Sequence, residues 1–410
     1  MSNTFGRIGT ANAFDNGLRN LQSRQSAIID LQGQISAQKG VQRGSDDPTA
    51  AAAAERATTR LSRIGTEQKA LAAQTATIKS SESTLGKVTD AVQAFRDLVV
   101  SAGNGSYDAA ARADLVQQLS SLRDQVLALA NQTDSNGMSL FGGLGSTATP
   151  FVDGGASGVT YNGVRGQNAS NGNAISTTID GYAAFMDVPT GNGVFTIGLP
   201  KDATGKVTNT GTAWASGGTV TDPTALTGNS YSVTFAVDAA GNTTYSVPNS
   251  NPPIAGQPYT SGQPISFDGM SFTVSGKPAN GDSMDIGPSK KTSIFSVMDQ
   301  AISEIGKAGA NVGAISQTVS QSLLQLDSGM ARVSASRSYA GELLNRAERI
   351  GDTQDERSDQ VTADLSLAEG SDLNSQVKRI SEFQSQQTAY SAALASYAQI
   401  QKLSLFNYIS

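Results

Sequence analysis

The last forty residues of the chain carry apolar side chains at intervals of three and four. Side chains at these intervals lie on one side of a helix, so the pattern predicts one long helix with an apolar face. No residue from Phe383 to Gln401 is charged, which favours a helix that is packed on more than one side. A membrane span is the rival interpretation, but five Gln, three Ser and one Thr make this stretch too polar for hydrocarbon.

A second apolar stripe lies near the start of the chain, where Phe14, Leu21, Ile28 and Ile35 are seven residues apart. This is the spacing of a coiled-coil seam. We therefore expect the two terminal helices to pair with each other and with neighbouring copies, and a helical hairpin that closes a soluble domain is the alternative. The predicted assembly surface comprises Phe14, Leu18, Leu21, Ile28, Leu31, Ile35, Leu373, Val377, Ile380, Phe383, Tyr390, Leu394, Tyr397, Ile400, Leu403 and Phe406.

The terminal helices are expected to be unstable in isolation. Ordering one residue costs about 1–2 kcal/mol, and each buried apolar side chain returns about 1.5–3 kcal/mol, although only about one residue in four is apolar. We therefore expect a free monomer to be ordered from about residue 46 to 370 and disordered outside this range.

The segment GVQRGSDDP, residues 40–48, separates the first helix from the next. Its two glycines end one helix, and Asp47 and Pro48 suit the N-cap and the first position of another. Apolar residues at helical intervals from 61 to 99 then predict about forty residues of helix.

Two further helical regions lie on either side of a stretch with a different pattern. Glycines in residues 101–108 turn the chain into a third helix, marked by leucines and valine in 115–129, which is expected to lie antiparallel to the second. Helical spacing returns at 292–305 and continues from 312 to 365, which predicts a short helix and then one of about fifty residues.

Residues 142–290 hold most of the Gly and Pro and show short alternating runs, which indicates β structure. Two hairpins are predicted, one around Gly241-Asn242 and one around Asp268-Gly269, within about seven short strands. The expected fold is mainly α with an inserted all-β domain. Its three parts are a terminal coiled-coil domain of residues 1–45 and 371–410, a long-helix bundle of residues 46–142 and 291–370, and an outer β domain of residues 143–290.

Composition removes several classes of function. The 410-residue chain has a net charge of −6 and a sequence pI near 4.9, which argues against nucleic acid as a partner. It contains no Cys and no His, so thiol chemistry, zincin sites and Ser-His-Asp triads are excluded. We expect no enzymatic activity, no cofactor and no metal. The first residues lack an apolar h-region, so no cleaved signal peptide is expected.

The few motifs that resemble reactive sites have structural interpretations. GGLG and GSDDPTA lack the strand, helix and Gly-Lys spacing of a phosphate loop. Asp134 and Gly137 suggest a calcium loop, but the Glu at the twelfth position is missing and a helix-ending turn explains them better. Asp46 and Asp47 are a possible carboxylate pair, for which helix capping is the favoured interpretation.

Four segments, in order along the chain, resemble the flagellin superfamily and within it the hook-filament junction proteins. They are GSDDPTAAAAAERA after the first helix, NQTDSNGMSLFGG at 131–143, PANGDSMDIGPSKKTSIFSVMDQAISEI from 278, and QKLSLFNYI at 401–409. The resemblance covers residues 1–142 and 278–410. Asn407 departs from it, because an acidic residue is common there, and residues 143–277 match no known pattern.

The resemblance implies a structural subunit that lies in a ring of copies between hook and filament. Its implied partners are another hook-associated junction protein on the hook side, flagellin on the filament side and a flagellar export chaperone. It also implies an extracellular location in the flagellum, reached through the flagellar type III export channel. Two alternatives remain: flagellin itself, and a surface adhesin or glycan-binding module that uses Trp214 or Tyr259 of the β insert.

Overall fold

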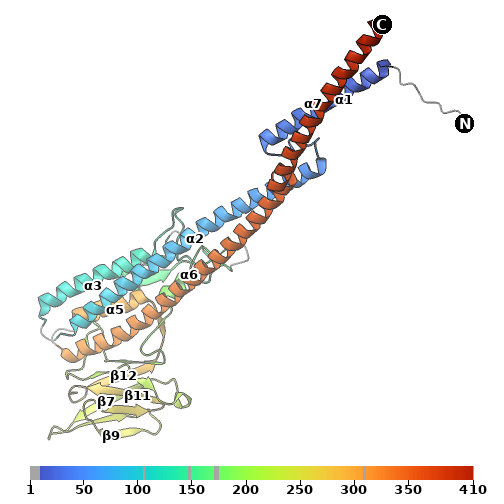
Figure 1. The fold of residues 1–410 in the computed structure, drawn as a ribbon. Coiled ribbons are helices and arrows are strands. Elements are labelled where there is room, and N and C mark those ends of the chain that lie inside the picture. Colours follow the sequence, from blue (N-terminus) through green and yellow to red (C-terminus); the bar gives the residue numbers. More distant parts are fainter. Residues whose placement is uncertain (1–9, 105–106, 146–148, 170–174, 308–310, 410) are drawn as a thin grey trace. The chain divides into compact units, whose positions relative to one another are not determined.

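The computed structural model describes residues 10–104, 107–145, 149–169, 175–307 and 311–409. Its α-helices are α1 (Thr10–Ala37), α2 (Pro48–Ala102), α3 (Ala109–Ala130), α4 (Gly181–Phe185), α5 (Ile294–Lys307), α6 (Val312–Glu369) and α7 (Leu373–Ile409). The strands lie between α3 and α5, so the predicted class, mainly α with an inserted β region, is confirmed (Figure 1).

The strands of the insert are shorter and more numerous than the seven expected from the sequence. They are β1 (Phe151–Asp153), β2 (Val159–Tyr161), β3 (Val188–Pro189), β4 (Phe195–Gly198), β5 (Trp214–Ala215), β6 (Thr219–Val220), β7 (Tyr231–Val237), β8 (Thr243–Val247), β9 (Ile254–Pro258), β10 (Pro264–Phe267), β11 (Met270–Ser275), β12 (Ser283–Pro288) and β13 (Lys291–Thr292). Short 3₁₀ turns lie at Gly155–Ser157 and Pro223–Ala225.

The start of α2 is the one predicted from the sequence. The Asp47 carboxylate accepts hydrogen bonds of 3.0 Å from the backbone N–H groups of Thr49 and Ala50, and Pro48 is the first helical residue. This satisfies two N–H groups that have no partner within the helix. α2 runs for 55 residues and α6 for 58, both longer than predicted, because the helices continue into flanking stretches that carry few apolar residues.

The chain divides into two compact units, residues 1–69 with 351–410 and residues 70–350. The boundary falls inside α2 and α6, whereas the sequence suggested borders at the loops near residues 45 and 371. The apolar core of the second unit begins at Leu71 and ends at Ile350, so packing rather than a break in the helices marks this division. The predicted domain borders remain predictions.

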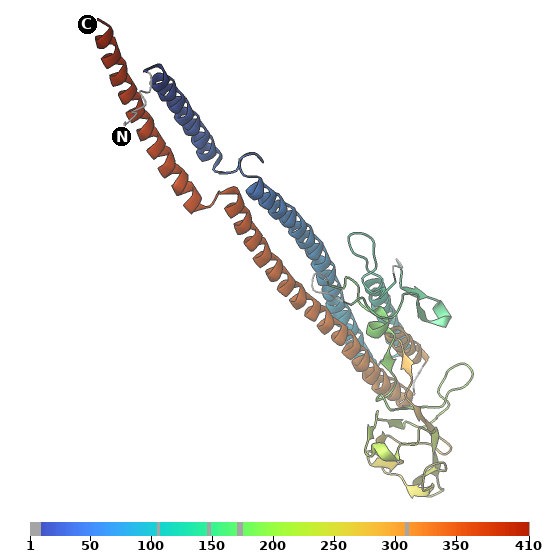
Figure 2. The same cartoon turned by 90° about the vertical axis from the view of Figure 1, so that its right-hand side faces the viewer.

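The helical part of the second unit is built by α2, α3, α5 and α6, with α3 packed directly against α5. Figures 1 and 2 show α2 and α6 side by side in this unit. The side chains of Leu85, Phe95, Leu119 and Phe295 are fully buried between these helices. Their positions follow the helical spacing from which the helices were predicted.

The first part of the insert belongs to this helical core. The ring of Phe151 lies 5.3 Å from that of Phe185 and 5.6 Å from that of Phe295 in α5, measured between centroids. Phe141 meets Phe185 edge-on at 5.5 Å. Because Phe151 and Phe185 are fully buried against a helix, residues up to about 189 depend on the bundle for their packing.

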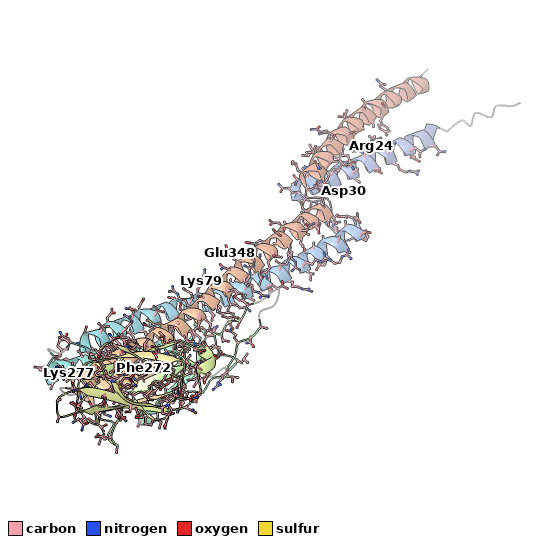
Figure 3. All side chains as sticks on the ribbon, turned by 90° about the horizontal axis from the view of Figure 1, so that it is seen from below. Arg24, Asp30, Lys79, Phe272, Lys277 and Glu348 are labelled. Carbon is pink, nitrogen blue, oxygen red and sulfur yellow. The ribbon has the colours of Figure 1, made fainter. Side chains whose placement is uncertain are left out.

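The rest of the insert has its own apolar core, made by two antiparallel sheets. One sheet has the strand order β4-β12-β7-β8-β9, and the other pairs β11 with β10, β5 and β6. Side chains of both sheets form one buried cluster, in which Tyr231 contacts Phe267 at 5.1 Å between ring centroids. Phe272, labelled in Figure 3, lies in this cluster and is 2% exposed.

Both predicted hairpins are confirmed. β7 and β8 pair across the turn that contains Gly241, and β10 and β11 pair across Asp268-Gly269. Asp268 and Gly269 have φ values of +45° and +76°, which suit a tight hairpin turn. A side chain at Gly269 would place its Cβ 2.1 Å from the carbonyl oxygen of Asp222, so only glycine fits.

Arg123 of α3 ties three elements of the second unit together. Its guanidinium is 8% exposed and donates to both carboxylate oxygens of Asp299 in α5, at 2.8 and 3.2 Å, and to Asp153 in β1. Asp124 lies 3.2 Å from the same group but is 74% exposed. The hydrogen bond from Arg123, followed by one from the backbone N–H of Gly155, lowers the pKa of Asp153 below its ordinary value of 3.8.

We expect Asp153 to stabilise the fold at neutral pH and to lose this effect in acid. A carboxylate with a lowered pKa in the folded state stabilises above its unfolded pKa, and the contribution disappears as the pH falls through the folded value, here below about 3.8. The variant Asp153→Asn should lower the free energy of unfolding by about 1 kcal/mol at pH 7 and by less at pH 3. Thermal melts across pH measure this difference.

Asp124→Asn is the matched control, because it removes an exposed carboxylate from the same guanidinium. It should leave the melting temperature nearly unchanged at either pH. Equal effects of the two variants would show that the buried contact to β1 has no special role.

Candidate functional site

The first unit holds the pair of helices formed by the two ends of the chain. α1 and α7 contact each other along their length, as predicted from the two apolar stripes (Figure 2). Leu21 is 8% exposed between them. A Cβ on Gly17 would lie 3.6 Å from the ring of Tyr397, an ordinary van der Waals distance, so α1 and α7 are in direct contact here.

A polar contact crosses this seam. The guanidinium of Arg24 in α1 donates to the side-chain oxygen of Gln386 in α7 at 3.3 Å. Figure 3 shows Arg24 on α1 beside α7. Because Gln386 is neutral, the seam gains a hydrogen bond without placing a carboxylate in the uncharged stretch of α7.

The apolar positions of α7 divide into two neighbouring stripes. Phe383, Tyr390 and Tyr397, seven residues apart, are half-buried on the side that meets α1. The other stripe is exposed: Leu373 is 75% accessible, Val377 58%, Ile380 45% and Leu394 43%. The sequence analysis had treated these residues as one face, and the structure separates them because α1 covers only one side of the helix.

α1 also leaves apolar side chains uncovered. Leu18 is 48% exposed and Ile29, which the sequence analysis did not select, is 60% exposed. Ile28, Leu31 and Ile35 are half-buried in the seam. The side chains of Phe14, Ile400, Leu403 and Phe406 lie outside the described residues.

We define the open apolar surface as Leu18, Ile29, Leu373, Val377, Ile380 and Leu394. Exposed apolar residues are normal when they are isolated, whereas a continuous stripe marks an interaction surface. Leu373, Val377 and Ile380 lie at intervals of four and three residues on α7, so they form an exposed apolar cluster that a partner can cover.

A compact joint lies where α1 ends and α7 begins. The backbone N–H groups of Gly40 and Val41 donate to the carbonyl oxygen of Glu369 at 2.8 and 3.2 Å, and Lys39 forms a 2.7 Å ion pair with the Glu369 carboxylate. α6 ends at Gly370, whose φ is +63°. These contacts join the exit of α1 to the end of α6, in one unit.

Arg379 is the functional residue of this joint that sequence reasoning missed. Its side chain is only 8% exposed, and a Cβ on Gly40 or Gly370 would lie 2.8 or 3.0 Å from its Nη1 atom. The end of the flexible Arg379 side chain can move away from a Cβ at residue 40, whereas Gly370 is favoured also by its φ of +63°. In the sequence, Gly40 was interpreted only as part of a helix break, and Gly370 was not singled out.

Asp46 and the loop around Asp134 both have structural roles. The Asp46 carboxylate accepts from the backbone N–H groups of Arg43 and Gln42, at 2.8 and 3.0 Å, and these bonds lower its pKa. Asp134 accepts from the N–H groups of Asn136 and Met138 at 2.8 and 2.9 Å, which closes a turn after α3. The turn at Asp134 is the one that the sequence indicated, whereas the expected capping role belongs to Asp47 and Asp46 stabilises the loop before α2 instead.

The described residues show neither a metal site nor a membrane-spanning helix. Within those residues, no group of three or more Asp or Glu side chains is arranged to hold a metal ion. In the same part of the chain, no helix is both long enough and apolar enough to cross a membrane.

We expect α1 and α7 to be the least protected helices of the monomer. Among their described side chains, Leu21 is the only apolar one that is buried, and Arg379 is the only charged one. In hydrogen exchange of a dilute sample, their amides should exchange at least about tenfold faster than those of α2 between residues 85 and 99. Limited proteolysis should remove them first. Equal protection of α7 and α2 in the monomer would contradict the prediction that the ends need partners.

Comparison with known proteins places this geometry among flagellar proteins. Residues 8–146 match the family described as the bacterial flagellin N-terminal helical region. Flagellar hook-associated protein 3 of Salmonella typhimurium is 37% identical over 147 residues, which cover 35% of this chain and 46% of that protein. The Escherichia coli protein of the same name is 30% identical over 191 residues, 46% of this chain and 56% of the relative. The chain thus spans about half the length of the curated relatives it matches.

Solved structures match over a longer range. Flagellar hook-associated protein 3 from Legionella pneumophila superposes with a TM-score of 0.67 at 29% identity, over 76% of this chain and 98% of that one. A flagellar junction protein, FlgL, from the same organism gives 0.64 at 31% identity, over 72% and 99%. FlgL of Xanthomonas campestris gives 0.65 at 25% identity, over 76% and 99%.

Proposed function

This chain belongs to the family of flagellar hook-associated protein 3, and from that premise we propose that it is a structural subunit that joins the flagellar hook to the filament. The observation that supports this most directly is the open apolar surface of α1 and α7. A stripe of leucine, isoleucine and valine that remains 43–75% exposed in the single chain suits a subunit that is completed by its neighbours.

The proposed partners follow from the two sides of such a junction. Copies of the chain form a ring through the terminal helices, another hook-associated junction protein binds on the hook side, and flagellin binds on the filament side. The uncharged stretch from Phe383 to Gln401 supports contacts on several sides, because no charge has to be desolvated when neighbours pack against it. A flagellar export chaperone would cover the same apolar residues before assembly.

We propose that the protein acts outside the cell, in the flagellum, and has no catalytic role. Export through the flagellar channel, without a cleaved signal peptide, is part of this proposal. The absence of Cys and His from the sequence supports a purely structural role, since it removes the commonest nucleophiles and general bases.

The test of this function is a strain that lacks the protein. Such cells should keep their hooks, lose their filaments and release flagellin monomers into the medium, and a plasmid copy should restore motility. Filaments of normal length on the mutant cells would refute the proposal.

The second candidate is flagellin itself, because the matched family of residues 8–146 is the N-terminal region of flagellin. Purified protein distinguishes the two. Growth of filaments without limit from the pure protein supports flagellin, whereas a failure to elongate supports the junction subunit.

A further inference from the structure

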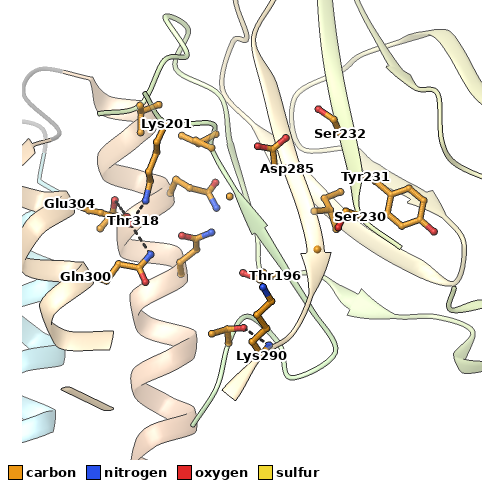
Figure 4. A pocket seen from close by; sticks show the side chains of 18 of the residues that line it. Thr196, Lys201, Ser230, Tyr231, Ser232, Asp285, Lys290, Gln300, Glu304 and Thr318 are labelled. Atoms are coloured by element: carbon orange, nitrogen blue, oxygen red, sulfur yellow. Dashed lines mark hydrogen bonds and ion pairs between the residues drawn. The ribbon is translucent and has the colours of Figure 1, made fainter. Parts of the chain in front are cut away.

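The second unit contains a cleft of about 660 Å³ between the β sandwich and helices α5 and α6 (Figure 4). It is separate from the open apolar surface, which belongs to the first unit. Its volume lies in the range of about 300–1,000 Å³ that is usual for small-molecule sites.

The floor of the cleft is the polar face of three neighbouring strands. In β4, β12 and β7 the apolar side chains alternate toward the sandwich core, so the residues between them face the helices. Asp285 in β12 is paired with Gly198 on one side and Ser232 on the other. Two positions further, Gly287 is paired with Thr196. The two glycines leave space between the polar side chains.

The wall of the cleft includes three glutamines of α6, spaced by four residues. Gln317 donates to the carbonyl oxygen of Ile197 at 3.1 Å and accepts from the N–H of Ala215 at 2.7 Å. Gln321 donates to the same Ile197 oxygen. These two amides fasten α6 to the sandwich.

The third glutamine has no such role. Gln325 lines the cleft and is 6% exposed, and its amide has no hydrogen-bond partner among the described residues. Its amide nitrogen and oxygen are not among the fully buried polar atoms, so they face the water that fills the cleft. It therefore marks a position where a polar ligand group can bind.

Some charged side chains of the cleft are paired with other residues of the protein, and others are not. Glu304 pairs with Lys201 and also accepts from Gln300 at 2.7 Å and from the Thr318 hydroxyl at 3.0 Å. Asp285 and the ammonium of Lys290 form no ion pair or hydrogen bond within the described part of the chain. The negative charge of the Asp285 carboxylate and the positive charge of the Lys290 ammonium cancel, which favours a neutral ligand over an ion.

We propose that this cleft binds a short, neutral, hydroxyl-rich saccharide. A sugar hydroxyl both donates and accepts, so neighbouring hydroxyls match the Asp285 carboxylate, the Lys290 ammonium and the Gln325 amide together. Hydroxyls of Thr196, Ser230 and Ser232 add further partners along the floor. An apolar molecule of this size would leave all of these groups unpaired.

The site differs from the one that the sequence suggested. Tyr259 donates its hydroxyl to the carbonyl oxygens of Val274 and Gly276, at 3.2 and 2.8 Å, and Trp214 lies in β5 opposite Ser275. Neither lines the cleft. Figure 4 shows the Tyr231 ring directed away from the helices, so no aromatic ring stacks on the ligand and we expect weak binding.

The experiment titrates the full-length monomer with maltotriose, cellotriose and the trimer of N-acetylglucosamine, followed by saturation-transfer NMR and calorimetry. At least one sugar should bind with a Kd in the range of about 0.1–10 mM. Asp285→Asn and Gln325→Leu should each weaken it by about tenfold or more, because each removes a hydrogen-bonding group from the ligand. Asp90→Asn, on the exposed surface of α2, is the control and should bind normally.

Melting curves show whether each variant is folded, and Asp285 is exposed, so its substitution tests the site even if Gln325→Leu is unstable. Absence of binding by all three sugars up to about 10 mM overturns the proposal. Binding that both variants retain at full strength also overturns it, because the ligand then lies elsewhere. Neither outcome affects the junction function, which is tested by filament attachment.

Discussion

A Leu394→Asp variant is expected to fold normally as a monomer and to be missing from hook-filament junctions. Leu394 is 43% exposed in the single chain, so a carboxylate there remains hydrated until neighbours pack against it. The nearest charged residues along the chain are Glu382 and Lys402, and neither can pair with it across ten or so helical residues. Burying this unpaired charge in an apolar contact costs several kcal/mol, which is a loss of about a hundredfold or more in assembly.

The matched control is Ser396→Asp. Ser396 is exposed and lies about 200° around the helix from Leu394, so the same carboxylate is placed away from the open apolar surface. Immunogold labelling of junctions and swimming assays measure incorporation, and thermal melts confirm folding. Normal labelling with Leu394→Asp would show that this stripe is not an assembly surface. Equal failure of both variants would show that the contact is not confined to one face.

The sequence predicted the long helices and the two hairpins because their signals are local. Asp47 and Pro48 mark the start of α2 by capping chemistry, and Asp268-Gly269 marks a hairpin because few other pairs adopt positive φ twice. Apolar intervals of three or four fix which side of each helix is buried. None of these features depends on distant parts of the chain.

The division of α7 into a covered and an open stripe could not be predicted in this way. Phe383 and Ile380 are both apolar and differ by three positions, so spacing alone places them on one face. Only the position of α1 decides that Phe383 is half-buried and that Ile380 is 45% exposed. The same holds for Arg379, which is buried beside two glycines, at 40 and 370, that are distant in sequence from each other.

The cleft was hidden for a related reason. Gln317, Gln321 and Gln325 read as polar gaps in an amphipathic helix, which is usually the mark of a solvated face. The contacts of Gln317 and Gln321 to β4 and β5 depend on tertiary packing between a helix and a sandwich that are more than a hundred residues apart in sequence. The pattern of residues alone does not distinguish a polar helix face that packs against the β sandwich from one that is exposed to solvent.

A chain from which residues 191–289 are excised is expected to keep a folded helical unit. Thr190 donates its backbone N–H to the carbonyl oxygen of Lys290 at 2.9 Å, and Val188 and Pro189 of β3 pair with β13. The two cut ends therefore already lie antiparallel and can be joined by an Asn-Gly turn. The excision removes the whole core of the sandwich but no residue of the helical core, so circular dichroism should show strong helix and one cooperative melt.

The matched variant removes residues 143–290, the domain border suggested by the sequence. It takes Phe151 and Phe185 out of the cluster around Phe295, and losing a buried phenylalanine costs about 3–5 kcal/mol each. Two such losses approach the entire stability of a typical domain, about 5–15 kcal/mol, so this variant should melt without cooperativity or far below the shorter excision.

If both variants melt alike, residues 143–189 contribute nothing to the bundle and the border at 143 is correct. If the shorter excision already abolishes the cooperative melt, the helices depend on the sandwich through contacts such as those of Gln317, and the two cores form one folding unit.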